Sequence, residues 1–370
     1  MRSLESPLKR ILLRLIIAFR SGTQYPSSQL PIDSFNRILI IRQHDQLGDL
    51  LIATPALRAV RRKFPRAFIA VVVREYTAPV VENNPYVDEV IVFYEKLWRW
   101  NVRKLIAFWK SLRNDFDCTI VLNTISRSLS SDIIALLSGA NYIVGPDHLL
   151  LDPSQAEKIY NVPALRSSAQ KHEIERNLDI VRALGADEND FEYDLVLTDA
   201  EVNEVERTYQ SLAITPGKTV VGVHFGALNP SKCFSLEKLS SVIDWMIETY
   251  HVEIVLIISP NEIERRKVIL STVHHKLYSA PMMPLRIMAA FIRHLSFILC
   301  NDTGILHIAS SQRVPTISFH SLSDPAIWKP PHARHFAVRA DDSLITSITI
   351  RQVQAAVTTA MEKYVGKPIA

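Results

Sequence analysis

Glycine is the residue that this chain lacks most clearly, with 10 in 370 residues against a usual share of about 7%. Because glycines are so few, the motifs that depend on them can be checked one by one. No G-x-G-x-x-G is present, which excludes the common dinucleotide fingerprint, and no G-x-x-x-x-G-K-[ST], which excludes a Walker-type nucleoside triphosphatase. The G-x-S-x-G elbow of the α/β hydrolases is also absent.

Cysteine is scarce as well. Cys118, Cys233 and Cys300 lie far apart and form no C-x-x-C, which indicates a reducing, cytoplasmic compartment and no structural zinc. The 12 histidines contain no H-E-x-x-H. The pairs His274-His275 and His332/His335 have no cysteine nearby, so ordinary surface histidines are expected there, and neither a metal nor a cofactor.

Most of the chain carries no excess of positive or negative charge. Lys and Arg number 42 and Asp and Glu 38, a net charge of +4. The first twenty residues hold five basic residues against Glu5 alone, so the rest of the chain is neutral in sum. The basic pI therefore does not indicate a nucleic-acid partner for the folded body.

A long hydrophobic run is missing from the basic N-terminus, residues 6–20, where the longest uncharged stretch is five residues and a bilayer span needs about 20. No small-residue cleavage site follows, which argues against a signal peptide. Ser6 suits an N-cap and Pro7 a first helical position. Most of the apolar residues fall in one broad arc, and the basic residues fall in the opposite arc together with Leu13 and Ile17. Such a cationic amphipathic helix could lie in an anionic membrane surface or against the protein body; the clustered basic residues favour the membrane.

From residue 37 onward, short apolar runs alternate with helical stretches, which predicts βαβ units and a parallel sheet. Strands are expected at 37–42, 67–73, 90–93, 118–122, 219–224, 253–258, 297–299 and 316–319, and helices at 50–63, 132–137, 173–184, 236–250 and 262–273. The sequence predicts an N-terminal segment 1–32 and two α/β domains, 33–200 and 201–370, with 187–217 as the inter-domain region. Ligands of such folds bind at the carboxyl ends of strands.

Three loops that follow predicted strands carry polar residues suited to chemistry. In the first, Gly48 permits a tight turn and Asp49 begins a helix, as an N-cap or as a general base facing a ligand. The second, 224–232, ends in Lys232, which is either an anion clamp or a solvated lysine. In the third, 299–309, a strand runs into a helix whose first N–H groups could bind phosphate, beside Asp302, Thr303, Gly304 and His307.

Taken together and in order, these segments resemble the ADP-heptose:lipopolysaccharide heptosyltransferases, glycosyltransferase family 9. The resemblance runs from about residue 37 to 340. The motifs that carry it are Leu47-Gly48-Asp49 with Pro55-Ala56-Leu57, Asn84-Pro85-Tyr86-Val87-Asp88-Glu89-Val90, His172-Glu173 with Asn177-Leu178, Asp302-Thr303-Gly304 with His307, and Asp324-Pro325 with Trp328.

The resemblance implies a GT-B fold: an acceptor-side domain (33–200) and a nucleotide-sugar-binding domain (201–370), both Rossmann-like, facing across a cleft, with no essential metal. Asp115-x-Asp117 is accordingly interpreted as a pair of turn residues. By position, Asp49 matches the family's catalytic base and Gly48 belongs to the acceptor loop. Lys232, Thr303 and Gly304 match the donor-phosphate site, and Asp302, His307 and Glu262 support donor binding.

The implied reaction is inverting transfer of a heptose or related sugar, from ADP-heptose or another nucleotide diphosphate sugar, to a lipopolysaccharide core acceptor. The enzyme would be cytoplasmic and peripheral at the cytoplasmic face of the inner membrane, held through residues 1–22. The chain departs from the family's pattern at Cys233-Phe234-Ser235, Ser259-Pro260 and His320. These departures leave open whether the enzyme uses another sugar or another cell-surface acceptor. They also leave open whether Glu262 or Glu264 contacts the nucleotide. A member that binds without catalysis is the other alternative.

Overall fold

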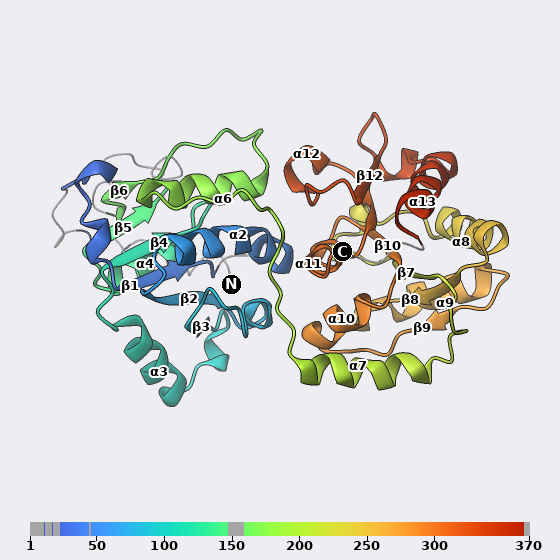
Figure 1. Ribbon diagram of the computed structural model, residues 1–370, viewed down its shortest axis with the longest axis horizontal. Helices are drawn as coiled ribbons and strands as arrows, with labels where there is room; N and C mark the ends of the chain where they lie inside the picture. The colour runs from blue at the N-terminus through green and yellow to red at the C-terminus, as the bar shows by residue number, and fades with distance from the viewer. Residues whose placement is uncertain (1–10, 12–16, 18–22, 44–45, 147–158, 366–370) are drawn as a thin grey trace. The chain divides into compact units, whose positions relative to one another are not determined.

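The computed structural model describes residues 11, 17, 23–43, 46–146 and 159–365. The chain divides into two compact units, residues 1–194 and 195–370 (Figure 1). The predicted helix at 6–20 lies outside the described residues except for Ile11 and Ile17. Ile11 is exposed, whereas Ile17 is buried in the hydrophobic core of the first unit.

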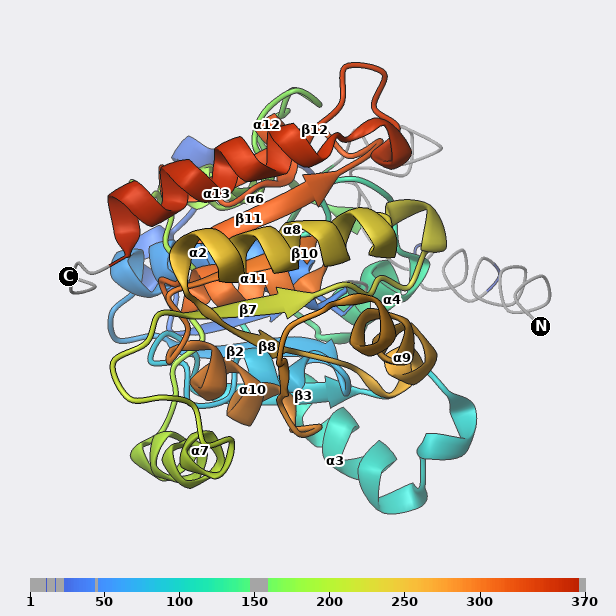
Figure 2. The same cartoon turned by 90° about the vertical axis from the view of Figure 1, so that its right-hand side faces the viewer.

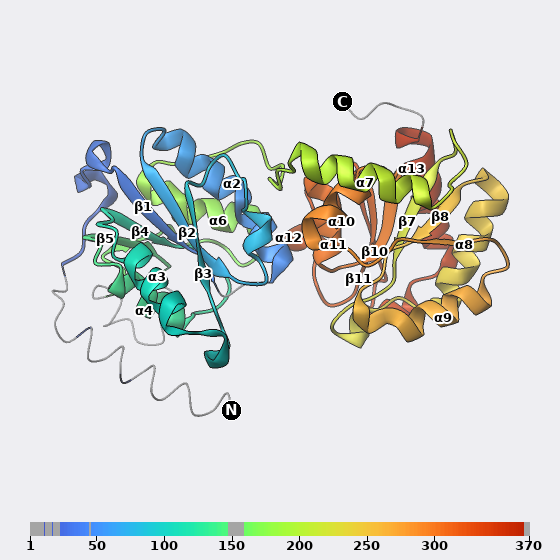
Figure 3. The ribbon, with the colours of Figure 1, turned by 90° about the horizontal axis from the view of Figure 1, so that it is seen from below.

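The first unit is built on a six-stranded parallel sheet with the order β3-β2-β1-β4-β5-β6. The strands are β1 (Arg37–Ile41), β2 (Phe68–Arg74), β3 (Glu89–Phe93), β4 (Cys118–Val121), β5 (Tyr142–Gly145) and β6 (Val162–Pro163). The helices are α2 (Leu47–Lys63), α3 (Val102–Leu112), α4 (Leu129–Leu137) and α6 (Glu173–Val181). Figure 3 shows α2 and α6 on one face of the sheet and α3 and α4 on the other, so β1 is apolar on both faces.

The second unit repeats this plan with the order β12-β11-β10-β7-β8-β9. The strands are β7 (Val220–His224), β8 (Glu253–Leu256), β9 (Tyr278–Ser279), β10 (Phe297–Asn301), β11 (Thr316–His320) and β12 (His335–Arg339). The helices are α7 (Asp199–Ser211), α8 (Leu236–Tyr250), α9 (Ile263–Thr272), α10 (Leu285–Ile292), α11 (Gly304–Ser311), α12 (Pro325–Trp328) and α13 (Ile350–Tyr364). In Figure 2, α8, α9 and α13 lie in front of the sheet, and their apolar faces share its core.

Short 3₁₀ helices connect these elements, at Ser27–Gln29, Ile32–Ser34, Ala78–Val80, Leu97–Arg99, Arg182–Leu184, Pro230–Lys232, Pro260–Glu262 and Ile345–Ser347. The region predicted to link the domains differs from expectation, because it contains helix α7. Thr198 and Glu201 form a capping box at its start, and Arg286 on α10 binds the Glu201 carboxylate at 2.5 Å. α7 is thereby tied into the second unit.

Helix α2 accommodates a proline in its interior. Pro55 has no N–H, so the carbonyl of Leu51, four residues earlier, loses its helical donor. The hydroxyl of Thr54 donates to that carbonyl at 2.7 Å and accepts in turn from the backbone N–H of Asp194 at 2.9 Å. Thr54 therefore supplies the hydrogen bond that the Leu51 carbonyl would otherwise lack, and it joins α2 to the end of the first unit at Asp194.

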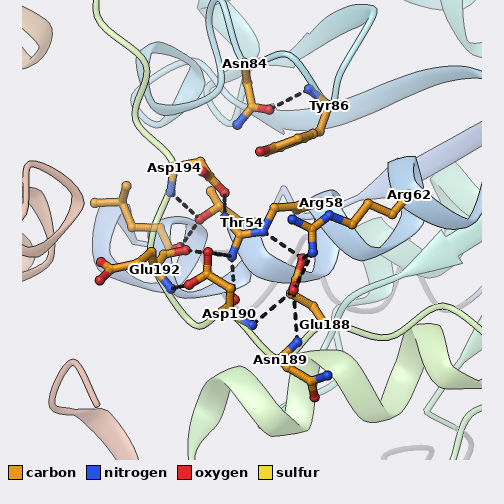
Figure 4. A network of polar contacts seen from close by, with 11 residues as sticks. Thr54, Arg58, Arg62, Asn84, Tyr86, Glu188, Asn189, Asp190, Glu192 and Asp194 are labelled. Atoms are coloured by element: carbon orange, nitrogen blue, oxygen red, sulfur yellow. Dashed lines mark hydrogen bonds and ion pairs between the residues drawn. The ribbon is translucent and has the colours of Figure 1, made fainter. Parts of the chain in front are cut away.

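Arg58, one turn further along α2, is the centre of a buried ion network (Figure 4). Its guanidinium binds Glu188 at 2.8 Å and Asp194 at 2.7 Å, and its own side chain is 3% exposed. It also donates to the backbone carbonyls of Asp190 and Glu192. Burial raises the pKa of Asp194 to about 6, although Arg58 opposes this shift. The network fixes residues 188–194 against the helix.

Candidate active site

The first unit contains a cavity of about 180 Å³ beyond the carboxyl ends of β1 and β4. Parallel strands bring the loops that follow them to one edge of the sheet, and the lining residues come from these loops and from the start of α2. They are Arg42, Gln46, Asp49, Asn123, Thr124, Ile125 and Ser126. The lining of the cavity is thus mostly polar and includes one cationic side chain, Arg42, and one carboxylate, Asp49.

Asp49 is both a helix cap and a cavity residue. With Gln46 it forms a capping box at the start of α2, in which Asp49 Oδ2 accepts from the backbone N–H of Gln46 at 3.0 Å. Its side chain also lines the cavity. Gly48 precedes it in the first turn and is buried. The two interpretations drawn from the sequence are therefore compatible, because capping engages one carboxylate oxygen.

A second carboxylate, Glu173, lies near this cavity and was not singled out as a site residue by the sequence. It is fully buried at the start of α6 and accepts hydrogen bonds from the Thr124 hydroxyl and, at 2.9 Å, from Arg176. Burial raises the pKa of Glu173, and the Asp49 charge adds to this, whereas Arg42 and Arg176 oppose it. Glu173 thus interacts electrostatically with both charged residues of the cavity lining, Arg42 and Asp49.

In the second unit, Lys232 and Asp302 form an ion pair, with Lys232 Nζ 2.9 Å from Asp302 Oδ2. Ser323 donates to the same oxygen at 2.6 Å. Burial alone would raise the pKa of Asp302, but His320, Ser323 and Lys232 together hold it below its usual value. Asp302 is accordingly an anion, which fixes the ammonium group of Lys232 at the carboxyl end of β10.

Asn301 at the end of β10 holds the loop that carries Lys232. Its side-chain oxygen accepts from the N–H of Phe234 at 3.0 Å, and its amide nitrogen donates to the carbonyl of Gly226 at 3.1 Å. The sequence placed Asn301 in a post-strand motif without giving it this role. Its contacts bridge residues some seventy positions apart in the chain, so no local pattern shows them.

Thr303 is the N-cap residue of α11, which begins at Gly304, and its side chain makes no capping bond. His307 lies one turn further on and is buried. His320, where the family pattern suggests a glycine, is also buried, and its Nε2 lies 2.8 Å from the Ser318 hydroxyl. Burial lowers the pKa of His320 to about 4, so it is a neutral side chain beside Asp302.

The two glutamates left open by the sequence have different surroundings. Glu262 is buried, with Oε2 accepting from the N–H of Ser259 at 2.8 Å and Oε1 3.8 Å from His224 Nε2. A Cβ atom at Gly226 would lie 1.5 Å from Glu262 Oε1, so the glycine makes room for this carboxylate. Glu264 is exposed and pairs with Lys267 at 2.7 Å. Glu262 is the one that lies against the Lys232 loop.

Asp115 and Asp117 serve the turn before β4, as expected. Asp117 Oδ2 accepts from the backbone N–H groups of Asn36 and Arg37, at 2.8 and 2.9 Å. Asp115 has a left-handed backbone, with φ of 47°. Neither carboxylate belongs to the cavity of the first unit.

The histidine pairs differ from one another. His274 and His275 both bind Asp244, at 2.8 and 2.9 Å. The expectation of a surface residue is wrong for His335, which is buried on β12 between the hydroxyls of Ser310 and Thr316. Within residues 23–43, 46–146 and 159–365, no cluster of three or more His, Cys, Asp or Glu could hold a metal ion.

Solved structures share this architecture. A glycosyltransferase family 9 structure from Veillonella parvula aligns with a TM-score of 0.77 at 19% identity, over 93% of this chain and 99% of the other. The Escherichia coli heptosyltransferase WaaC with ADP aligns with a TM-score of 0.69 at 20% identity, over 88% of this chain and 99% of the other. These likenesses define the class of fold: a GT-B-like α/β fold with two parallel sheets.

Sequence comparison gives the family. The model of glycosyltransferase family 9 (heptosyltransferase) matches residues 105–351, and the chain belongs to this family. A Haemophilus influenzae protein named only as a glycosyltransferase is 26% identical over 80% of this chain and 86% of its own length. The Escherichia coli lipopolysaccharide heptosyltransferase 3 is 22% identical over 76% of this chain and 83% of its own length. Among the described helices, none is long and apolar enough to cross a membrane.

Proposed function

We propose that this family 9 enzyme transfers a heptose from ADP-heptose to a lipopolysaccharide core acceptor, with inversion at the anomeric carbon. The observation that carries the proposal is the Lys232–Asp302 pair beside the start of α11, which fixes a cation next to free helix N–H groups. The names of the similar heptosyltransferases support the choice of sugar and acceptor.

The acceptor step needs a base, because a sugar hydroxyl is a poor nucleophile at neutral pH. Asp49 lines the cavity of the first unit and keeps one carboxylate oxygen outside the capping bond. In the proposed reaction it accepts the proton as the acceptor oxygen attacks the anomeric carbon. Gly48 is the acceptor-loop residue that places Asp49 in the first turn. Attack opposite the departing diphosphate inverts the anomeric centre.

The leaving nucleoside diphosphate gains negative charge as the glycosidic bond breaks. Lys232 and the first N–H groups of α11, at Thr303 and Gly304, would bind this charge, because helix N-termini and cations stabilise anions. Asp302 orients Lys232. His307 supports the donor site from α11, and Glu262 supports it from the 3₁₀ helix Pro260–Glu262, which packs against Gly226.

Purified protein offered a panel of nucleotide sugars, with the lipid-linked core as acceptor, tests this proposal directly. Turnover with ADP-heptose supports it. Turnover with another nucleotide sugar would favour the alternative suggested by His320, a family 9 enzyme with another donor or another cell-surface acceptor. Mass spectrometry of the envelope glycolipid from a deletion strain should show loss of the same sugar. Tight donor binding without turnover would identify a non-catalytic member.

The Lys232→Ala variant should bind the intact nucleotide diphosphate sugar at least about tenfold more weakly, since a hydrogen bond to a charged group contributes about 1.5–3 kcal/mol. The affinity for the nucleoside alone should change little, because the lost contact is with phosphate. Titration calorimetry with both ligands measures the difference. Lys267→Ala, an exposed lysine on α9, is the matched control, and equal losses for both ligands would contradict the assigned role.

We further propose a cytoplasmic enzyme bound to the anionic face of the inner membrane through residues 1–22. Each basic residue near such a surface contributes about 1 kcal/mol, so a variant lacking these residues should sediment less with anionic vesicles and keep activity on a soluble acceptor fragment. Since Ile17 is buried in the core, a Lys9→Glu/Arg10→Glu variant is needed beside the deletion. Undiminished vesicle binding of both variants would show that residues 1–22 do not hold the protein at the membrane.

A further inference from the structure

The outer side of α3 and the 3₁₀ helix before it carries a dense group of exposed apolar side chains. The members are Leu97, Trp98, Val102, Leu105, Ile106 and Trp109, which are 48–77% exposed; we call this surface the α3 face. All six lie within thirteen consecutive residues. Exposed apolar patches of this kind mark interaction sites, because leaving them in water is unfavourable.

The helix beneath this face is firmly held. Leu112 and Phe108 on its inner side pack into the core of the first unit, and Trp100 stacks edge-on against Phe93, Tyr94 and Phe108. Trp100 also donates to the carbonyl of Tyr94 at 2.7 Å. Figure 3 shows α3 beside β3, the strand at the edge of the sheet. The exposed side chains therefore belong to a helix that is anchored to the first unit along a neighbouring side.

The α3 face has a basic border and no acidic residue within it. Projected at 100° per residue, Val102, Leu105, Ile106 and Trp109 fall within an arc of about 100°, with Arg103 and Lys110 beside it. Between residues 96 and 114 there are six basic residues and no acidic one. The acidic neighbour at one end, Glu95, is bound to Arg74. Arg99, one of the six, pairs with Glu75 at 3.1 Å, while Arg103 and Lys110 lie beside the stripe. This surface therefore combines an apolar stripe with an excess of positive charge.

The apolar stripe and the basic border together fit one kind of binding partner. An apolar stripe flanked by Lys and Arg suits the boundary between acyl chains and anionic headgroups, where tryptophan is favoured and long basic side chains reach the phosphates. We propose that the α3 face binds the surface of an anionic phospholipid bilayer, with Trp98 and Trp109 at headgroup depth. This inference goes beyond the proposed transfer reaction, since it depends on neither the sugar nor the acceptor, and it concerns residues distinct from 1–22.

Tryptophan fluorescence of the full chain tests the inference, because residues 1–22 contain no tryptophan. The probe is vesicles of phosphatidylglycerol and phosphatidylethanolamine that contain brominated acyl chains, which quench tryptophans at the acyl boundary. We expect the wild type to sediment with these vesicles and its fluorescence to be quenched. In the Trp98→Phe/Trp109→Phe variant most of the quenching should disappear while sedimentation persists. Quenching that is the same in this variant would overturn the proposal.

Two further variants test the apolar and the basic parts separately. Leu105→Gln/Ile106→Gln should weaken vesicle binding about tenfold or more, and Arg103→Glu/Lys110→Glu should do so at low salt. The matched control is Val268→Gln/Leu270→Gln, two residues of α9 that are 41% and 43% exposed, which should bind like the wild type. All variants should keep transfer to a soluble acceptor fragment, so a failure here is distinguishable from a failure of the proposed reaction.

Three results would contradict the inference. One is the absence of binding of the wild type to anionic vesicles. Another is wild-type binding by the Leu105→Gln/Ile106→Gln and Arg103→Glu/Lys110→Glu variants, which would place the lipid contact elsewhere. The third is self-association in sedimentation velocity that the Leu105→Gln/Ile106→Gln variant removes, without any quenching by lipid; the face would then be an interface between copies of this chain.

Discussion

Replacing Asp49 by asparagine is expected to lower the rate of sugar transfer by about 10²–10⁴-fold, the contribution of a positioned general base. The amide keeps an oxygen that can accept from the N–H of Gln46, so the capping of α2 persists. It cannot take up a proton at neutral pH, so the proposed chemical step fails. Steady-state kinetics with donor and acceptor at saturation measure the loss, and donor affinity should remain close to that of the wild type.

The control for this variant is Asp199→Asn, which makes the same change in the first turn of α7, where the side chain is exposed. It should leave the rate unchanged. Thermal unfolding of both variants shows whether the folded state is retained. An Asp49→Asn enzyme that turns over within about tenfold of the wild type would mean that Asp49 is a cap alone and that the base lies elsewhere.

Replacing Arg58 by leucine should destabilise the first unit by about 3–5 kcal/mol, since removing one partner of a buried ion pair leaves charges without compensation. Asp194 would lose the guanidinium that binds it, and Glu188 would keep only Arg62. Urea unfolding followed by circular dichroism measures the change. Lys267→Ala breaks an exposed ion pair and should cost at most about 1 kcal/mol.

The loss of unfolding free energy in the Arg58→Leu variant should also depend on pH. Burial already raises the pKa of Asp194 to about 6, and without the cation it rises further. A carboxyl group whose pKa is raised in the folded state destabilises that state once it is ionised. The variant should therefore lose more stability at pH 8 than at pH 5. A penalty that is equal at both pH values, or below about 1 kcal/mol, would show that the network contributes little.

The sheets could be predicted from the sequence where their strands are central. β1 and β2 are buried on both faces and therefore read as continuous apolar runs. β6 and β9 have two residues each, too few for any pattern, and they form because a neighbouring strand offers an edge. α10 was also missed, since seven of its eight residues are buried and a short, mostly apolar segment cannot be told from a buried strand by periodicity alone.

The candidate site was predictable to the extent that it follows single strands. Asp49, Lys232 and Thr303 come directly after strands or at helix starts, so their positions were visible in the sequence. The contacts of Thr124 with Glu173 and Arg176 were not, because they join residues about fifty positions apart. The same is true of Asn301, whose two bonds reach across the sheet to the Gly226 loop.

Gly226 and Glu262 are coupled sterically, so we expect correlated substitutions at these two positions among relatives. A side chain at position 226 would overlap the glutamate's carboxylate, its Cδ atom at 2.0 Å included, so a mutation there would displace Glu262 while leaving the strands of the sheet in place. A side chain at position 226 is therefore expected only where Glu262 has moved or has been replaced, whereas glycine can persist after the glutamate is lost. In an alignment of relatives, joint departure at these two positions should mark lineages in which the proposed donor pocket has changed.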